Sequence, residues 1–267
     1  MDLELRGRRA LVTGGSKGIG KAIAKLLAEE GADVALLARD ATTLQAAATE
    51  LATATGRTVV GVQADTTQDA QVQAAVAEAV RRLGGSIDIL VNAAAEPAGY
   101  AAPPTVEQIT GHFLFGEIDT KVMGYIRCVR EVVPGMRAAG WGRIVHISGL
   151  AARQTGSTVG SIRNVALVAL AKNMADELGP AGINTNVVHP GVTRTERTAA
   201  LVQARAAQQG ISVQEVEAQM AAGNSIRHLV DASEVAQVVA FLCSPKARAI
   251  NGDVVTAGGG APRSIHY

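Results

Sequence analysis

The stretch at residues 13–20, Thr-Gly-Gly-Ser-Lys-Gly-Ile-Gly, constrains the fold of this chain more than any other feature of its sequence. An apolar, β-prone run at residues 9–12 precedes it, and Ile23, Leu26 and Leu27 recur after it at helical spacing. Glycines allow a sharp turn and a close approach of the backbone to a ligand. A strand, a glycine-rich turn and a helix in this order place a pyrophosphate at the positive N-terminus of the helix. The stretch therefore predicts a dinucleotide-binding turn.

Further apolar runs alternate with helical patterns along the rest of the chain. Continuous apolar runs are typical of parallel strands covered on both faces, and the alternation predicts right-handed crossovers. No internal repeat or linker interrupts the pattern, so we expect an α/β fold with a single domain over residues 1–267. Its sheet should be Rossmann-like, doubly wound and parallel, flanked by helices. The strands expected after the first are residues 33–38, 59–62, 87–91, 143–147, 183–188 and 253–256.

One segment departs from this alternation. Residues 195–222 are rich in alanine and glutamine and carry little strand signal. We interpret residues 192–226 as a helical insertion over the carboxyl edge of the sheet, where it would cover a substrate as a lid. Its apolar positions could equally form a contact between subunits.

The composition limits the classes of partner. Charged residues make up 18% of the chain and the net charge is +1, so neither nucleic acid nor an acidic membrane surface is an expected partner. The N-terminus has no signal-peptide pattern, and no apolar run approaches the ~18 residues of a membrane span. Cys128 and Cys243 lie outside any metal-ligand spacing, so we expect two buried thiols and no metal site. We therefore expect a soluble, cytoplasmic protein.

Five segments in the right order resemble the short-chain dehydrogenase/reductase family over nearly the whole chain. Residues 13–20 look like its coenzyme motif, with glycines spaced more widely than in G-x-G-x-x-G. Asp65 matches its adenine-contacting acid, and Asn-Ala-Ala-Ala at residues 92–95 stands where the family has Asn-Asn-Ala-Gly. Pro190-Gly191 with Thr195 matches the segment that closes on the nicotinamide, and residues 251–260 resemble the last strand and its glycine pair.

The resemblance implies a set of cofactor-binding residues. They come from the glycine turn, the ends of the second, third and fourth strands, and the segment after the sixth. In this sequence they are Gly14, Ser16, Lys17, Gly18, Ile19, Gly20, Arg39, Asp65, Thr66, Asn92, Ala93, Ala94, Pro190, Gly191, Val192 and Thr195.

The end of the second expected strand bears on which cofactor binds. NAD enzymes of this kind place a carboxylate there, which would repel a 2′-phosphate. Here Ala38 holds that position and Arg39 follows it, and Lys17 adds a second cation inside the glycine motif. Two cations and no acid favour a dianion through charge-assisted hydrogen bonds. We therefore expect NADP rather than NAD.

The sequence departs from the family at the catalytic positions. The family relies on a Ser, a Tyr four residues before a Lys, and an Asn from the helix before the fifth strand. The run at residues 142–149 places the family's Ser on Gly149, with Ser148 one position earlier. The following helix places the Tyr on Gly160 and the Lys on Asn164, and no Tyr-x-x-x-Lys occurs in the chain. Carbonyl reduction through the family's tyrosine is therefore excluded.

Counting back from Gly149 places Lys121 at the family's Asn position. Because Asn164 holds the Lys position, the two residue types have exchanged places, and they should face one another across the site. A poorly solvated Lys121 should have a lowered pKa and would then be a proton donor or a carbonyl polariser. The alternative is that Lys121 points outward and is solvated. The candidate catalytic residues are therefore Lys121, Asn164 and Ser148, ahead of His189, Tyr100 and His112, while His146 is expected in the core.

Three hypotheses for the function stay open. The first is an NADP(H)-dependent oxidoreductase for a carbonyl, alcohol or enone, with a non-standard proton relay. The second is a non-redox isomerase, cyclase or dehydratase that keeps the nucleotide, and the third is an inactive binding subunit. The substrate should be a small, apolar molecule, because the 192–226 insertion is rich in alanine and valine. The resemblance also implies a homodimer or homotetramer.

Overall fold

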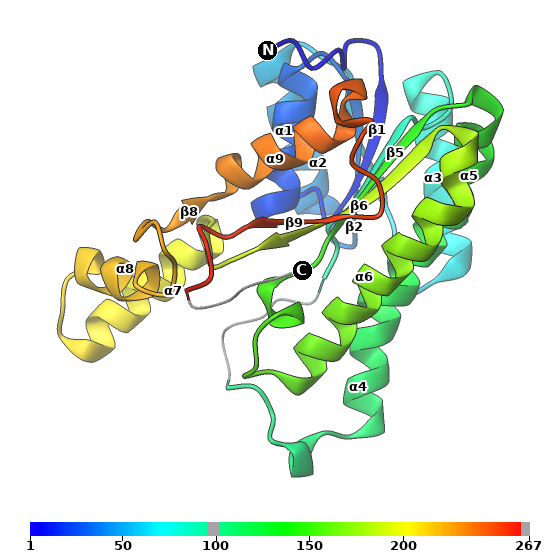
Figure 1. Cartoon of the computed structure of the whole chain (residues 1–267). Helices are drawn as coiled ribbons and strands as arrows, with labels where there is room; N and C mark the ends of the chain where they lie inside the picture. The colour runs from blue at the N-terminus through cyan, green and yellow to red at the C-terminus, as the bar shows by residue number, and fades with distance from the viewer. Residues whose placement is uncertain (96–101, 263–267) are drawn as a thin grey trace.

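The computed structural model describes residues 1–95 and 102–262, which form a seven-stranded sheet between two layers of helices (Figure 1). All seven strands pair in parallel, as the sequence predicts. Their order across the sheet is β3-β2-β1-β4-β5-β6-β9. The bounds are β1 Arg9–Thr13, β2 Asp33–Ala38, β3 Val59–Gln63, β4 Ile89–Asn92, β5 Gly142–Ile147, β6 Ile183–Pro190 and β9 Val254–Ala257.

Two groups of helices cover the two faces of the sheet (Figure 1). One face packs against α1 Gly18–Glu29, α2 Ala41–Thr55 and α9 Ala232–Cys243. The other face packs against α3 Asp69–Leu83, α5 Gly124–Ala139 and α6 Thr158–Leu178.

The strands supply alternate residues to these two cores. Val12 belongs to the first core and Leu11 to the second, and Leu36 and Leu37 of β2 divide in the same way. Successive side chains of a strand point to opposite faces, so a strand covered on both faces must be apolar throughout. This is why the strands are continuous apolar runs in the sequence.

The chain reverses direction across the sheet between β1 and β4. It runs outward through β2 and β3, returns to β4 beside β1, and continues through β5, β6 and β9. Ligands of open α/β sheets bind at such a reversal, outside the carboxyl ends of the strands.

A long helical path precedes β5. It consists of α4 Gly111–Ile118, a π-helical turn η2 at Asp119–Met123, and α5. Short 3₁₀ turns complete this half of the chain: η1 Val106–Gln108, η3 Leu150–Ala152, η4 Gly179–Ala181 and η5 Pro245–Ala247.

The segment predicted as an insertion is helical. It contains α7 Glu196–Gln209 and α8 Val213–Ala221, flanked by the paired short strands β7 Thr193–Arg194 and β8 Val230–Asp231. The two helices share a small core of their own, formed by Val202, Ala206 and Val216. They extend away from the main sheet (Figure 1). Whether they act as a lid stays a prediction.

Within residues 1–95 and 102–262, no helix is both long and apolar enough to cross a membrane.

Candidate active site

The glycine turn expected to bind a dinucleotide lies between β1 and α1, at the carboxyl edge of the sheet. Gly14 has φ +66°, a left-handed conformation that favours glycine. Gly20 has no room for a side chain, because a Cβ there would lie 2.3 Å from the carbonyl oxygen of Gly14. The first turn of α1 therefore packs directly against the backbone of the glycine turn.

Thr13 joins this turn to the loop that follows β4. Its Oγ1 accepts hydrogen bonds from the backbone N–H groups of Ala93 and Ala94, at 3.0 and 3.1 Å. Thr13 and Asn92 also lie opposite each other in the β1–β4 register. The structure thus brings the segments 13–20 and 92–94 together where the strand order reverses.

A carboxylate lies at the N-terminus of α1. The backbone N–H of Gly18 donates to Glu196 Oε2 at 3.2 Å, and Glu196 is the first residue of α7. Helix N-termini bind anions because their N–H groups and the helix dipole both favour negative charge. The N–H of Gly18 therefore already binds a negatively charged oxygen, that of Glu196.

The residues expected to select the cofactor lie at the same edge. Lys17 precedes α1 and Arg39 follows β2, and both are exposed. Asp40 is the first acid after β2, but its Oδ1 caps α2 by accepting the backbone N–H of Thr43 at 2.7 Å. Asp40 is thus used as a helix cap, and Ala38 and Arg39 at the end of β2 carry no carboxylate. An end of the strand without a carboxylate can accept the 2′-phosphate of NADP.

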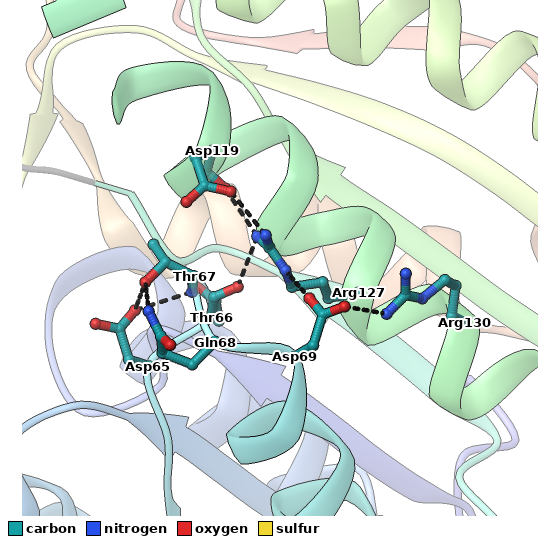
Figure 2. Close-up of polar contacts among 8 residues, drawn as sticks. All are labelled: Asp65, Thr66, Thr67, Gln68, Asp69, Asp119, Arg127 and Arg130. Carbon is teal, nitrogen blue, oxygen red and sulfur yellow. Dashed lines mark hydrogen bonds and ion pairs between the residues drawn. The ribbon is translucent and has the colours of Figure 1, made fainter. Parts of the chain in front are cut away.

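The loop after β3, which carries Asp65 and Thr66, is held by α5 (Figure 2). Arg127 of α5 pairs with Asp69 and Asp119, and it donates to the carbonyl oxygen of Thr66 at 3.2 Å. Asp65 Oδ1 accepts hydrogen bonds from the N–H and the hydroxyl of Thr67, both at 2.9 Å. These contacts tie the loop that carries Asp65 to α3, η2 and α5.

Residues 190–195, the segment expected beside the nicotinamide, follow the carboxyl end of β6. β6 ends at Pro190, and Gly191 packs against Gly258 so closely that a Cβ on Gly191 would lie 2.9 Å from the Gly258 Cα. Val192 is exposed, and Thr195 caps α7 by accepting the N–H of Thr198 at 3.3 Å. Gly18 lies beside Thr195, since a Cβ on Gly18 would be 3.6 Å from Thr195 Cγ2.

Lys121 lies in the π-helical turn η2, buried between two other elements of the site. Its side chain is only 4% exposed. Nζ donates one hydrogen bond to the carbonyl oxygen of Ser148 and another to Asn164 Oδ1, each at 3.0 Å. Lys121 therefore faces Asn164, and the alternative of an outward, solvated lysine is wrong.

The surroundings of Lys121 weaken its hold on the proton. Burial lowers the pKa of its ammonium to about 8. No carboxylate pairs with it among the described residues, and two of its three N–H donors are used by Ser148 and Asn164. One N–H donor is left without a protein partner in the described part of the chain, on a group that can release a proton near neutral pH.

Ser148 is turned differently from Lys121. Its hydroxyl donates to the carbonyl oxygen of Asn164 at 3.2 Å, which fixes the end of β5 to α6. Only its own carbonyl oxygen contacts Lys121. Ser148 and Asn164 are thus placed to position the ammonium, and the hydroxyl of Ser148 does not point at it.

Gly149 and Gly160, which the sequence comparison assigned to the family's Ser and Tyr positions, are both closely packed. A Cβ on Gly149 would lie 3.1 Å from Asn164 Nδ2. A Cβ on Gly160 would lie 2.6 Å from Ser157 Oγ, which caps α6 by accepting the N–H of Gly160 at 3.2 Å. Because of this cap, α6 begins at Thr158.

His146 of β5 belongs to a buried polar cluster with Tyr125 and Asn92. His146 stacks on Tyr125 with ring centroids 5.5 Å apart, and its Nδ1 lies 3.2 Å from Asn92 Nδ2. Burial lowers the pKa of His146 to about 3, so the ring is neutral. The Tyr125 hydroxyl donates to the carbonyl oxygen of Ile147 at 3.0 Å. Sequence reasoning missed Tyr125, although its i+4 spacing from Lys121 signalled a shared helix face.

The three lower-ranked candidates, His189, His112 and Tyr100, lie in different surroundings or outside the described residues. His189 is buried in β6 and its Nδ1 accepts the N–H of Gly149 at 3.3 Å, so it positions the end of β5. His112 is exposed on α4, beside Phe113. Tyr100 lies outside the described residues.

The strand order, the glycine turn at the reversal point and the anion-binding helix N-terminus define a Rossmann-type dinucleotide-binding protein. The family described as "Enoyl-(Acyl carrier protein) reductase" matches residues 14–261 of the chain. Among curated proteins, the human dehydrogenase/reductase SDR family member 4 is 33% identical over 98% of this chain and 90% of its own length. The chain belongs to the short-chain dehydrogenase/reductase family.

Two further relatives extend the comparison. The NADPH-dependent reductase BacG of Bacillus subtilis is 29% identical over 97% of this chain and 99% of its own. The L-sorbose reductase of Gluconobacter frateurii, solved in complex with NADPH and L-sorbose, has a TM-score of 0.90 and is 30% identical. That likeness covers 99% of this chain and all of the reductase chain (100%).

Proposed function

We propose that the protein is an NADP(H)-dependent oxidoreductase for a carbonyl, alcohol or enone substrate, in which Lys121 takes the place of the family's tyrosine as proton donor. The observation that carries the proposal is the position of Lys121 Nζ, buried between the Ser148 carbonyl oxygen and Asn164 Oδ1. A buried ammonium without a carboxylate partner costs stability, so its presence between Ser148 and Asn164 favours a chemical role.

The cofactor would be held by the residues described at the carboxyl edge. The glycine turn and the N–H of Gly18 would bind the pyrophosphate once Glu196 is displaced, and Lys17 with Arg39 would bind the 2′-phosphate. When bound, NADPH supplies the hydride. The NADPH dependence of BacG and the NADPH complex of the sorbose reductase support this choice of cofactor.

The chain's own groups would then handle the proton. Lys121 would donate its free N–H to the substrate carbonyl oxygen, which polarises the carbonyl and transfers a proton as negative charge develops there. Asn164 and the Ser148 carbonyl would hold the ammonium in place as positioning groups. After reduction, the neutral amine is re-protonated from solvent, because its pKa is about 8.

The substrate would lie between this centre and the helices α7 and α8, which we propose as the lid. Val192 at the start of that segment is 54% exposed, which favours a small, apolar substrate. We also propose a homodimer or homotetramer. Ile162 and Val165 on α6 are exposed apolar side chains on the helix through which the family associates.

A second candidate is a non-redox reaction, such as isomerisation or dehydration, with the nucleotide retained. The close-packed Gly149 and Gly160 favour it, since both positions lack the family's hydroxyl groups. A purified-protein assay against a panel of ketones, aldehydes and enones separates the two. Loss of NADPH absorbance with formation of alcohol or saturated product supports the oxidoreductase, whereas product formed at constant NADPH supports the second candidate. If no panel member gives a product, the result supports the third hypothesis, a binding subunit without catalytic activity.

Replacing Arg39 with Ala should weaken NADPH binding by about ten- to a hundredfold, because a charge-assisted hydrogen bond contributes roughly 1.5–3 kcal/mol. NADH lacks the phosphate and should lose little. Dissociation constants for both cofactors are the measurement, and Arg81→Ala on the exposed surface of α3 is the matched control. Equal losses for NADPH and NADH would refute the phosphate assignment.

A further inference from the structure

A cavity of about 540 Å³ opens at the amino ends of β5 and β6, on the edge of the sheet opposite to the glycine turn. It lies between the turns that precede these strands and the η5 turn. Its lining consists of Gly140, Trp141, Arg143, Gly179, Gly182, Asn184, Pro245, Arg248 and Asn251. Two arginines and no acidic residue are in this lining, so the cavity is positively charged.

Arg143 is the unusual residue of this cavity. It is 3% exposed, and it forms no ion pair with any residue of 1–95 or 102–262. Its Nε and Nη1 donate to backbone carbonyl oxygens of Ser244, Gly142 and Gly182, at 2.7 to 3.3 Å. Its Nη2 makes no hydrogen bond within the described residues. A buried guanidinium therefore keeps two N–H donors and a full charge without an acid.

The charged group that shares the Trp141 ring with Arg143 is another cation, Arg8. The guanidiniums of Arg8 and Arg143 lie 3.8 and 4.6 Å from the ring centre of Trp141. The partner of Arg8 is Asp88, at 3.8 Å, and Asp88 also pairs with Arg9 at 3.5 Å. Arg248, on the rim, forms no ion pair in the described part of the chain.

We propose that this cavity binds the phosphate group of a small metabolite, with Arg143 and Arg248 as its ligands. Guanidinium groups match the geometry of phosphate oxygens and bind them through paired hydrogen bonds. The volume exceeds what one phosphate needs and lies within the range of small-molecule sites, so the phosphate would belong to a larger molecule. The site is separate from the coenzyme, because the whole sheet lies between the two edges.

The charge balance supports the same conclusion. Burial lowers the pKa of Arg143 to about 10; Cys243 opposes this shift, and the smaller effects of Arg8 and Arg248 add to it. The group is still charged at neutral pH, and its charge is uncompensated. A bound dianion would supply the missing negative charge, as buried ionic groups require.

Trp141 makes the site directly observable, because it is the only tryptophan of the chain and lines the cavity. Inorganic phosphate titrated against chloride at constant ionic strength should change its fluorescence in a saturable way. The dissociation constant should rise about tenfold in Arg248→Gln, an exposed position where folding is not at risk, and by at least as much in Arg143→Gln.

Two controls separate this site from other phosphate effects. Arg81→Gln, on the surface of α3, should bind phosphate as the unmodified protein does. Arg39→Ala, at the coenzyme edge, should also leave the Trp141 signal intact, and saturating NADPH should not displace it. An absent or unsaturable signal, an unchanged dissociation constant in Arg248→Gln, or loss of the signal in Arg39→Ala would overturn the proposal.

Discussion

Lys121→Met should lower kcat by about 10²- to 10⁴-fold, which is the usual contribution of a positioned general acid. Methionine keeps the length of the side chain but has no N–H to donate. NADPH affinity should change little, because the hydrogen bonds of Lys121 within the described residues go only to Ser148 and Asn164. Steady-state rates on a substrate identified from the carbonyl panel, together with NADPH titration of each variant, are the measurements.

Lys172→Met is the matched control for this substitution. Lys172 is an exposed lysine on α6 that pairs with Asp176 at 3.3 Å, so its loss should leave turnover intact. Full activity in Lys121→Met on any substrate would remove Lys121 from the mechanism. If Lys121→Met instead loses both activity and folding stability, Lys121 has a structural role.

The pH dependence provides an independent test of Lys121. Its pKa in the folded protein is about 8, below the ordinary value of 10.5, because burial disfavours the ammonium. Carbonyl reduction that uses the ammonium should therefore decline as pH rises through about 8. Folding stability should change in the opposite direction. Between about 8 and 10.5 the unfolded chain binds the proton and the folded protein does not, so stability rises with pH across that window. Both effects should be absent in Lys121→Met.

Gly160→Tyr combined with Asn164→Lys should fail to install the family's carbonyl reduction, and it should unfold more easily by about 3 kcal/mol or more. A side chain on Gly160 would displace the Ser157 cap, whose Oγ lies 2.6 Å from the Cβ position. Asn164→Lys would add a second ammonium where Lys121 is already buried. Denaturant unfolding and turnover on the same panel are the measurements.

The reciprocal exchange, Lys121→Asn with Asn164→Lys, serves as the control. It keeps one ammonium and one amide in the pair, so it should be clearly more stable than Asn164→Lys alone. Strong carbonyl reduction by the Gly160→Tyr, Asn164→Lys variant would show that the missing tyrosine was the only obstacle.

The sequence alone predicted the fold and the relation between Lys121 and Asn164. The apolar runs had to be parallel strands, because only strands covered on both faces can be apolar at every position. The glycine turn followed from local backbone requirements at Gly14 and Gly20. Counting back from Gly149 put Lys121 at the family's Asn position, the resemblance implied that this position faces Asn164, and the structure has the two side chains hydrogen-bonded.

Other features were decided by the tertiary structure alone, because they depend on contacts between segments that are distant in sequence. The π-helical turn directs Lys121 inward, and no local pattern announced it. Ser148 read as a catalytic hydroxyl, yet its Oγ is bound to the carbonyl oxygen of Asn164, a partner set by how α6 packs on β5. Glu196 reaches Gly18 across 178 residues of sequence. Arg143 is an ordinary strand residue in the sequence, and its burial beside a cavity without an acid comes only from the assembly of β5, β6 and η5.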